Sequence, residues 1–413
     1  MRGDTLYFKP AFPLQPDKSN QINYKKGILR LQIDAEKIFI FLVCAVNTGS
    51  RFLTGEFLRM DKHTYKTRLK VVRAGIARLK ADCLIATEPA NVTYLTGFTG
   101  DDSWVVILPR AVALVTDSRY TEQAAAQCRF CRIVERKEAI VKAIAELLRN
   151  RRGIKTAVVE KSISLANFQS LKKNLSCRLK TAEGIVESAR RKKDRAEVAA
   201  VRAAAKIAAR AFGCVLRQVK PGLTENELAG IVDFEIRKAG GTNSFATIVA
   251  FGPNASRPHH QPTSRKLRKN DNVLIDFGVR LDGYCCDLTR CFSVGTPRRI
   301  YTGVYAVVKQ AQAAAIRMVK AGVETSQVDT TAKEIIKKAD LPVYGHGTGH
   351  GLGLEVHELP AISGKAKGKL QAGDVITIEP AVYIPRRLGV RIEDDCLVTN
   401  DGCVVLTANC PKD

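Results

Sequence analysis

Four carboxylates lie within otherwise apolar, strand-like runs in the second half of this chain. Asp276 follows Val-Leu-Ile, Asp287 comes eleven residues later, and Glu379 and Glu393 follow Ile-Thr-Ile and Val-Arg-Ile. Burying a carboxylate is unfavourable unless it is paired with a cation or bound to a metal. Any fold of this chain must therefore bring positive charge, from basic side chains or from metal ions, to these four acids.

The histidines are concentrated in the same part of the sequence. Five of the six lie between residues 259 and 357, namely His259, His260, His346, His350 and His357. A single buried acid could pair with Arg290 or Arg391, but four acids with a histidine are not explained in that way. Four carboxylates and one imidazole form a hard, oxygen-rich ligand set, which two divalent ions sharing bridging carboxylates would satisfy. We therefore expect a dinuclear metal centre, and we expect His260 to face solvent.

Size and composition are those of an ordinary globular protein. The 413 residues are 45% hydrophobic and 26% charged, which suits two or three domains. The formal charge of +25 raises nucleic acid or an anionic surface as a partner. No apolar run reaches the ~18–20 residues of a membrane helix, and Asp34 and Glu36 before the run Ile38–Val46 argue against secretion. The spacing of the twelve cysteines does not suggest a disulfide framework, so we expect a reducing, cytoplasmic location and no membrane association.

Three regions are distinguished along the chain. Residues 1–59 show no sustained period, and we hypothesise that translation begins at Met60, the alternative being a natural but poorly ordered extension. Residues 60–187 alternate short apolar runs with helical patterns, which is typical of an α/β domain. Residues 188–413 begin with a basic stretch, Ser188–Arg195, interpreted as the solvated start of a helix rather than a nucleic-acid contact. Periodicity predicts helices at 68–79, 120–127, 137–148, 196–215, 225–239, 302–321 and 326–339, and strands at 83–86, 104–108, 113–116, 156–159, 273–278, 375–380 and 389–394.

The acids and one histidine occur in an order and in contexts that resemble a known family. Asp276, Asp287, His350, Glu379 and Glu393 resemble metallopeptidase family M24, the pita-bread family that includes methionine aminopeptidase, aminopeptidase P and prolidase. The segments 252–260 and 346–358 resemble its proline-specific branch, which has a histidine four residues before the ligand and another seven after it. The segments 91–100 and 116–120 resemble the creatinase-like domain that precedes the catalytic domain in prolidases.

The resemblance implies both a fold and a set of ligand roles. The fold is an α/β creatinase-like N-terminal domain followed by an α+β pita-bread catalytic domain with two pseudo-symmetric halves. Asp276 would hold one metal, His350 and Glu379 the other, and Asp287 and Glu393 would bridge both. Oxygen-rich ligands favour Mn²⁺, with Co²⁺, Fe²⁺ or Zn²⁺ as alternatives.

The resemblance also implies the residues that act on substrate. His259 and His357 would donate hydrogen bonds to the tetrahedral intermediate or to substrate carbonyls, and Glu379 would transfer the proton from water to the leaving nitrogen. His346 would be structural or contact the substrate. Arg391 lies two residues before Glu393, so on one strand both share a face, where Arg391 would neutralise a carboxylate near the metals or meet a substrate carboxylate. By the same logic Thr289, two residues after Asp287, would support the ligands.

Two local features accompany these residues. Gly347, Gly349, Gly351 and Gly353 are expected to let the backbone approach the metal site closely. Ala381 stands where the family usually has glycine, so a positive φ there would be strained by about 1 kcal/mol or more.

The function that follows is an Xaa-Pro aminopeptidase, with an Xaa-Pro dipeptidase (prolidase) as the alternative. A non-catalytic pita-bread protein that contacts nucleic acid is the alternative of another class. The expected partners are peptides with proline at the second position and a second copy of the chain, as a homodimer. Nucleic acid is not expected despite the basic charge.

Overall fold

The structure is a computed structural model, and it describes residues 61–412. The predicted extension of residues 1–59 and the predicted start at Met60 lie outside the described residues. Within residues 61–412, no helix is both long enough and apolar enough to cross a membrane.

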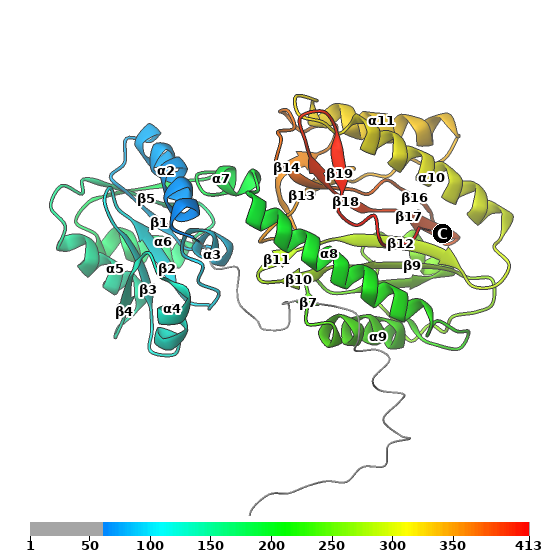
Figure 1. Ribbon diagram of the computed structural model, residues 1–413, viewed down its shortest axis with the longest axis horizontal. Helices are drawn as coiled ribbons and strands as arrows, with labels where there is room; N and C mark the ends of the chain where they lie inside the picture. Colours follow the sequence, from blue (N-terminus) through cyan, green and yellow to red (C-terminus); the bar gives the residue numbers. More distant parts are fainter. Residues whose placement is uncertain (1–60, 413) are drawn as a thin grey trace, which may run out of the picture. The chain divides into compact units, whose positions relative to one another are not determined.

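The amino-terminal region is a mixed β-sheet with helices on both faces (Figure 1). Its strands are β1 (Cys83–Ala86), β2 (Trp104–Ile107), β3 (Val112–Thr116), β4 (Arg132–Glu135), β5 (Thr156–Glu160) and β6 (Arg178–Ala182). Its helices are α2 (Lys62–Arg78), α3 (Pro89–Thr96), α4 (Thr121–Gln127), α5 (Ile140–Arg149) and α6 (Leu165–Asn174). The strand order is β4-β3-β2-β1-β5-β6, with β1, β2 and β3 antiparallel and the other pairs parallel.

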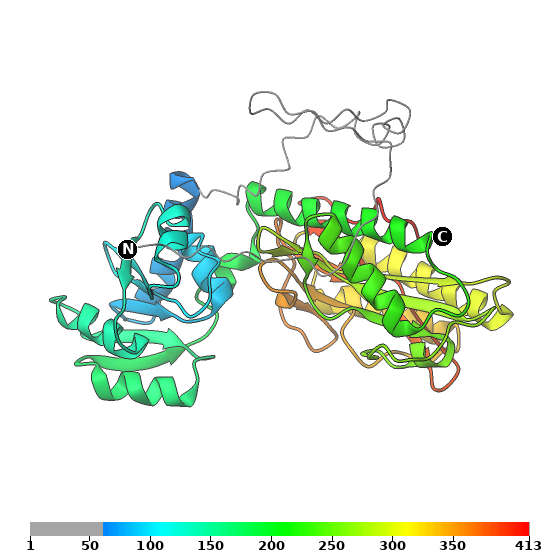
Figure 2. The same ribbon diagram turned by 90° about the horizontal axis from the view of Figure 1, so that it is seen from below.

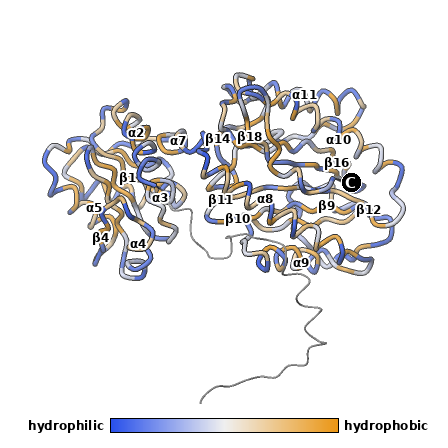
Figure 3. The backbone as a smooth tube through the Cα atoms, viewed as in Figure 1, coloured by the Kyte–Doolittle hydropathy of each residue, from blue (hydrophilic) through white to orange (hydrophobic). Residues whose placement is uncertain are grey.

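Alternation along the strands explains why both faces of this sheet are covered. Leu84 in β1 packs in one cluster with Leu69 of α2, whereas its neighbour Ile85 packs in another with Ile144 of α5. Strands buried on both faces are continuous apolar runs, as the hydrophobic colouring of this sheet shows (Figure 3). The predicted central strands are therefore present, whereas the edge strands β4 and β6 carry charged residues and were not predicted.

The second region is built around two pairs of helices (Figure 2). Its helices are α7 (Glu187–Arg191), α8 (Arg195–Leu216), α9 (Glu225–Lys238), the 3-10 helix η2 (Gly252–Ser256), α10 (Arg299–Met318) and α11 (Thr325–Lys338). Capping boxes at Asp194, Thr224 and Glu324 begin α8, α9 and α11 by satisfying their first free N–H groups. Helix α8 packs on α9, and α10 packs on α11.

Four small sheets accompany these helices. The strands are β7 (Thr242–Asn243), β8 (Ile248–Phe251), β9 (Asn272–Phe277), β10 (Val279–Leu281), β11 (Tyr284–Cys285), β12 (Leu288–Ser293), β13 (Gly349–Gly351), β14 (Glu358–Ile362), β15 (Val375–Ile378), β16 (Ala381–Ile384), β17 (Leu388–Arg391), β18 (Asp394–Val398) and β19 (Cys403–Val405). The strand orders are β11-β10-β7, β12-β9-β8, β14-β13-β15-β18-β19 and β16-β17. We call residues 195–293 the amino half and residues 299–405 the carboxyl half. One apolar core packs α8 and α9 on strands of the amino half, and a second packs α10 and α11 on strands of the carboxyl half together with Ala250, Ala255, Leu274 and Cys291 of the amino half.

The prediction of a single strand over residues 389–394 is wrong. Strand β17 ends at Arg391 and pairs with β16, whereas β18 begins at Asp394 and pairs with β15 and β19. Ile392 and Glu393 form the connection between two different sheets. Ala381 begins β16 and is not among the residues with positive φ, so the strain considered for this position is absent.

A buried ion pair joins the two halves. Arg290 of β12 and Asp394 of β18 are 2.8 Å apart, from Nη2 to Oδ1, and both side chains are at most 1% exposed. Arg290 also donates from Nη1 to the Glu393 carbonyl at 2.6 Å and from Nε to the Pro411 carbonyl at 3.0 Å. Lys412 Nζ lies 2.6 Å from the second carboxylate oxygen of Asp394, so the chain's last described residues pack on this seam.

Candidate metal centre

The five predicted metal ligands come from both halves of the catalytic region. The amino half contributes Asp276, which lies in β9, and Asp287, which directly precedes β12. The carboxyl half contributes His350 in β13, Glu379 directly after β15, and Glu393 directly before β18. Strand ends thus deliver the side chains to the region where the two halves meet.

Distances show that these side chains lie together. Nε2 of His350 is 3.8 Å from Asp287 Oδ2 and 3.6 Å from Glu379 Oε1. One ligand atom each from Asp287, His350 and Glu393 lie within 4.8 Å of one another. Asp276 is close enough to raise the pKa of Asp287, Glu379 and Glu393 by charge repulsion. The structure brings all five residues together, and their individual roles as ligands remain predictions.

The electrostatics of the cluster fit a cation. Burial raises the pKa of Asp287, as does repulsion from Glu393, and burial raises the pKa of Glu393, as does repulsion from Glu379. Burial raises the pKa of Glu379 to about 8, although Arg391 opposes the shift. Oδ1 of Asp276 and of Asp287 is buried without a hydrogen-bond partner among the described residues. Divalent cations would satisfy these oxygens and remove the repulsion, so the residues fit the metal that their chemistry implies.

The protonation of His350 suits a ligand. Burial, and the charge of His357, lower the pKa of His350 to about 4, so its ring is neutral at pH 7. Its Nδ1 lies 3.1 Å from the carbonyl oxygen of Gly351, which can only accept, so Nδ1 carries the hydrogen. The lone pair is therefore on Nε2, the nitrogen that faces the carboxylates.

Two buried threonines fix the cluster. Thr289 donates from Oγ1 to Glu393 Oε2 at 2.6 Å, which is the supporting contact predicted for it. Thr377 Oγ1 accepts the backbone N–H of His350 at 3.1 Å. Both threonines are fully buried, and each forms a hydrogen bond with one predicted ligand.

Arg391 lies inside the cluster. Its guanidinium forms an ion pair with Asp276 Oδ2. It also donates from Nη1 to Tyr383 Oη at 2.6 Å and from Nε to Thr289 Oγ1 at 3.1 Å. Its side chain is only 3% exposed. Arg391 was predicted either to neutralise a carboxylate near the metals or to meet a substrate carboxylate. The ion pair favours the first role, and the carboxylate is Asp276, itself a predicted metal ligand.

The other predicted histidines surround the carboxylates. The ring of His357 is exposed and lies 4.3 Å from the ring of His350, at 71°. His346 Nε2 is 3.2 Å from Tyr383 Oη, and burial lowers the pKa of His346 to about 4. His259 is exposed and lies near enough to contribute to lowering the pKa of His346. It follows Pro258, whose carbonyl accepts a hydrogen bond from Arg391 at 3.3 Å.

The expectation that His260 faces solvent is wrong. His260 is 4% exposed, and its Nε2 lies 2.9 Å from Oε2 of Glu225, the first residue of α9. Glu225 is fully buried and also accepts hydrogen bonds from the Phe251 backbone, the Asn254 side chain and both the backbone and the hydroxyl of Thr263. A buried carboxylate needs hydrogen-bond donors, and His260 is one of the partners of Glu225.

Sequence reasoning missed three residues of the site. Tyr383 links His346 to Arg391, and Glu225 fixes the segment that carries His259. Asp329 in α11 accepts from the Thr348 backbone at 3.0 Å and hydroxyl at 2.8 Å, and pairs with Lys333 at 3.0 Å. Helical spacing was a usable signal for Asp329, because it lies on the buried face of α11 with Val328, Ala332 and Ile336.

The glycines around His350 permit close approach between neighbouring strands, and their predicted role in letting the backbone approach the metal site stays a prediction. A Cβ at Gly349 would lie 1.9 Å from the Thr377 carbonyl oxygen, and one at Gly351 would lie 2.1 Å from that of Leu359. Strand β13 can therefore lie between β14 and β15 only with glycine at these positions.

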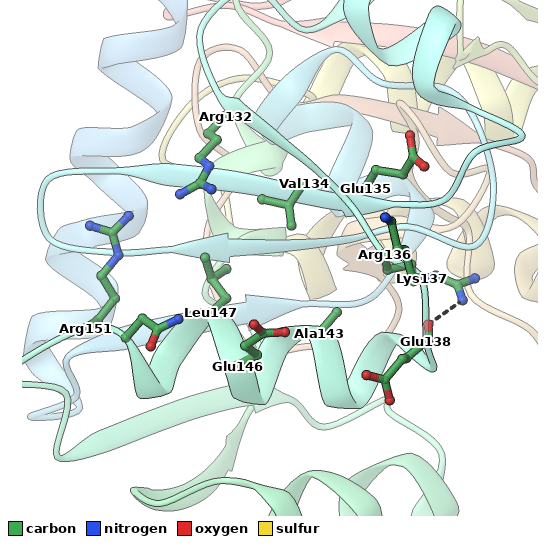
Figure 4. Close-up of a pocket in the computed structure, with 11 residues that line it drawn as sticks. Arg132, Val134, Glu135, Arg136, Lys137, Glu138, Ala143, Glu146, Leu147 and Arg151 are labelled. Carbon is green, nitrogen blue, oxygen red and sulfur yellow. Dashed lines mark hydrogen bonds between the residues drawn. The ribbon is translucent and has the colours of Figure 1, made fainter.

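A surface hollow lies elsewhere, away from the metal centre. It has a volume of 580 Å³ and is formed between β4 and α5 in the amino-terminal sheet region (Figure 4). Arg132, Arg136 and Arg151 line it together with Glu135 and Glu146. None of the predicted site residues lines it.

Comparison with known proteins gives matches along both regions. The model of metallopeptidase family M24 matches residues 199–400, and that of the creatinase/prolidase N-terminal domain matches residues 68–192. The Bacillus subtilis protein described as uncharacterized peptidase YqhT is 36% identical over 350 residues, which cover 84% of this chain and 99% of that protein.

Solved structures match over similar lengths. A structure described as Xaa-Pro dipeptidase from Bacillus anthracis has a TM-score of 0.82 and 32% identity, covering 84% of this chain and 99% of that chain. One described as X-Pro aminopeptidase from Thermotoga maritima has a TM-score of 0.76 and 33% identity, covering 82% and 98%.

These matches confirm the predicted fold class, an α/β creatinase-like N-terminal domain followed by a pita-bread catalytic domain. They agree with the fit of the buried carboxylates and His350 to divalent metal ions. The chain is therefore a metallopeptidase, and it belongs to metallopeptidase family M24.

Proposed function

We propose that this metallopeptidase removes the first residue of peptides that have proline at the second position, as an Xaa-Pro aminopeptidase. The observation that carries the proposal is the position of the histidines around the cluster. His357 packs against His350, and His346 reaches Arg391 through Tyr383. The solved structures named for Xaa-Pro substrates support it, because the matches cover 99% and 98% of the length of those two proteins.

Asp276, Asp287, His350, Glu379 and Glu393 would hold two divalent ions, with the roles that the family resemblance gives them. Bound ions would supply a Lewis acid for the scissile carbonyl and an acidified water as the nucleophile. Mn²⁺ is the proposed metal, because four of the five ligands offer carboxylate oxygen. Metal analysis of the purified protein, followed by activity after reconstitution with Mn²⁺, Co²⁺, Fe²⁺ or Zn²⁺, tests this choice.

The chain's own residues then move protons and orient the substrate. Glu379 is buried beside the cluster, where it can take a proton from the attacking water and pass it to the leaving proline nitrogen. His357 and His259 are exposed at the cluster and can donate hydrogen bonds to the oxygen that becomes negative. Arg391 forms an ion pair with Asp276 and holds the Tyr383 hydroxyl, which in turn contacts His346.

An Xaa-Pro dipeptidase is the second candidate. The specific observation that favours it is the TM-score of 0.82 with the Bacillus anthracis structure of that name, against 0.76 with the Thermotoga maritima aminopeptidase. The two activities differ in whether the pocket accepts residues beyond proline.

A peptide-length series separates the candidates. Metal-loaded protein is incubated with Ala-Pro, Ala-Pro-Ala and a longer Ala-Pro peptide, with Ala-Ala-Ala as the control, and released alanine is measured. We expect cleavage of the longer Ala-Pro peptides and none of Ala-Ala-Ala. Cleavage of Ala-Pro alone would favour the dipeptidase. Equal rates for wild type and Asp287→Ala would contradict the enzyme's proposed centre.

We also propose domain boundaries at residues 60–187 and 188–413, a homodimer and a cytoplasmic location. The eleven described cysteines are all free, which is compatible with a reducing compartment. Light scattering of the purified chain measures its oligomeric state, and a monomer would contradict the dimer.

A further inference from the structure

A cluster of buried charges joins the short helix α7 to the segment that carries His357. Arg190 forms an ion pair with Glu358 Oε1 and a second pair with Glu355 Oε2 at 2.8 Å. Lys193 Nζ lies 3.1 Å from Glu358 Oε2. We call Arg190, Lys193, Glu355 and Glu358 the Glu358 cluster.

The burial of this cluster corrects the interpretation of Ser188–Arg195 as a solvated helix start. The side chains of Arg190, Lys193 and Glu358 are 3%, 1% and 5% exposed. Burial raises the pKa of Glu358, but Lys193 and Arg190 more than offset it, so the carboxylate is ionised. Such charges are tolerated in the interior because they are paired.

The backbone is shaped around these charges. A Cβ at Gly353 would lie 2.9 Å from Lys193 Cε and 3.0 Å from either carboxylate oxygen of Glu358. Glycine at this position therefore lets Glu358 and Lys193 meet, which gives the last glycine of the run around His350 a role separate from metal approach.

Glu358 directly follows His357, and two of its contacts fix the backbone on either side of His357. Its Oε1 accepts the backbone N–H of Glu355 at 3.0 Å, which closes a turn with His357 inside. Glu358 is also the β14 residue that pairs with Gly351 of β13, next to His350. The turn and the pairing together fix where the exposed His357 ring lies against His350.

The amino-terminal domain takes part through Asn91 of α3. Asn91 is fully buried, and its Oδ1 accepts a hydrogen bond from Arg190 Nη1 at 2.8 Å. Asn91 Nδ2 in turn donates to Glu160 at 2.7 Å. A continuous set of buried contacts thus runs from the amino-terminal sheet to the residue beside His357.

We propose that Glu358, held by Arg190 and Lys193, is a positioning residue that sets the His357 imidazole where it can donate to the substrate. The proposal rests on the proposed role of His357 in Xaa-Pro cleavage. It assigns the junction between the domains a part in catalysis, in addition to any part in holding them together.

The first test is a double-mutant cycle with Glu358→Gln and His357→Gln, measured as kcat and KM on Ala-Pro-Ala. Loss of one hydrogen-bond donor to a developing oxyanion lowers kcat by about 10²–10³, and misplacement of about 1 Å costs about 10². We expect Glu358→Gln to lower kcat about ten- to hundredfold with KM little changed. In the His357→Gln background the same change should have little further effect, because coupled residues are not additive. Full additivity would overturn the proposal.

The neighbouring arginine provides a matched control. Arg191 of α7 pairs with the fully buried Asp374 through Nε–Oδ1 at 2.9 Å and Nη2–Oδ2 at 2.7 Å. Like the Arg190–Glu358 pair, it links α7 to the carboxyl half, but Asp374 lies far from His357 in sequence. Asp374→Asn should lower thermal stability as Glu358→Gln does, yet leave kcat within about twofold of wild type. An equal loss of kcat in both variants would show a merely structural effect.

A second variant guards against misfolding. Glu358→Gln leaves two buried cations short of a counter-charge, whereas Lys193→Met combined with Glu358→Gln removes a cation with the acid and retains the Arg190–Glu355 pair. The double variant should fold and still lose kcat. A folded double variant with wild-type kcat would contradict the proposal.

A measurement without turnover separates failure of this inference from failure of the proposed function. The ring signals of His357 are identified in NMR spectra of zinc-loaded protein by their loss in His357→Gln. We expect them to shift in Glu358→Gln and to remain unchanged in Asp374→Asn. If wild type does not cleave Xaa-Pro peptides, the proposed function fails, and unshifted His357 signals in Glu358→Gln would independently reject the positioning role.

Discussion

The two halves of the catalytic domain repeat a scaffold but divide the chemistry unequally. Helix α9 spans Glu225–Lys238 and α11 spans Thr325–Lys338, and each follows an isolated β-bridge, Thr224 with Lys266 and Glu324 with Lys369. The amino half provides two predicted ligands, both aspartates. The carboxyl half provides three, including the histidine.

The second helix of each pair carries a buried acid that fixes a histidine-bearing segment, Glu225 in α9 and Asp329 in α11. The two acids have different hydrogen-bond and ion-pair partners. Glu225 is held by His260 and by neutral donors of the segment before and after His259. Asp329 is held by Thr348 and by the cation of Lys333, which also donates to the His346 carbonyl. The repeated helices therefore serve as supports, while the predicted reactive residues lie at the seam where the halves meet.

The largest expected effect comes from breaking that seam. Asp394→Asn leaves Arg290 buried without its carboxylate, and loss of one partner of a buried pair costs about 3–5 kcal/mol. Urea unfolding of the metal-loaded protein measures the loss. Asp102→Asn is the control, because its pair with Arg119 is exposed and such pairs contribute about 0–1 kcal/mol. A loss for Asp394→Asn no larger than that of Asp102→Asn would show that the halves do not depend on this pair.

The next effect is the pH dependence of the metal-free protein. The folded pKa of Glu379 is raised from 4.5 to about 8, so the folded protein binds more protons than the unfolded chain between these values. Stability is therefore greatest below about pH 4.5 as far as this group is concerned, and it is lost as the pH rises through about 8. The acids of both halves repel one another as they ionise, and metal would reverse this.

Thermal unfolding from pH 5 to 9, with and without metal, measures this behaviour. We expect the metal-free melting temperature to fall with rising pH and the metal-loaded one to hold. Calorimetry in two buffers should also show proton release on metal binding at pH 7. A metal-free melting temperature that rises through this range would contradict the prediction.

Glu225→Gln and Asp329→Asn compare the two supports directly. Each change weakens a buried hydrogen-bonding centre, with an expected destabilisation of about 1–3 kcal/mol. Metal affinity should fall for Asp329→Asn, because Asp329 holds the segment that leads into His350, and remain near wild type for Glu225→Gln, which supports His259. Metal titration of both variants decides this. Equal losses would mean that the supports are not specific to their own half.

The smallest effect concerns the two threonines at the ligands. Thr289→Val removes the hydroxyl that donates to Glu393, at a cost to stability of about 1 kcal/mol and of about tenfold or more in metal affinity. Thr377→Val removes the acceptor of the His350 backbone N–H and should affect stability more than affinity. Competition with a chelator measures affinity, and an unchanged value for Thr289→Val would place Glu393 outside the metal's influence.

The sequence predicted the features that depend on burial of apolar runs. The central strands β1, β2, β3 and β5 have both faces covered, so most of their residues are apolar, and the strands were recognised. The four clustered acids were also recognisable, since an acid within such a run requires a counter-charge wherever the chain folds. His350 was distinguished from the other histidines by the family resemblance.

Features that depend on distant partners were not predictable. The run 389–394 has the alternation of one strand, but its hydrogen-bonding partner changes after Arg391. A basic stretch looks the same whether it is solvated or, like Arg190, paired with an acid at position 355 or 358. His260 gave no local sign of Glu225, which lies 35 residues earlier in the chain.

The strand order has a consequence for synthesis of the protein. The last predicted ligand, Glu393, is fixed only when β18 lies between β15 and β19, and β19 ends at Val405. A ribosome must therefore release the chain as far as Val405 before the centre can form. Metal ions cannot assist the earlier stages of folding, and products shortened before β19 would be unable to retain them, however well their amino-terminal domain had folded.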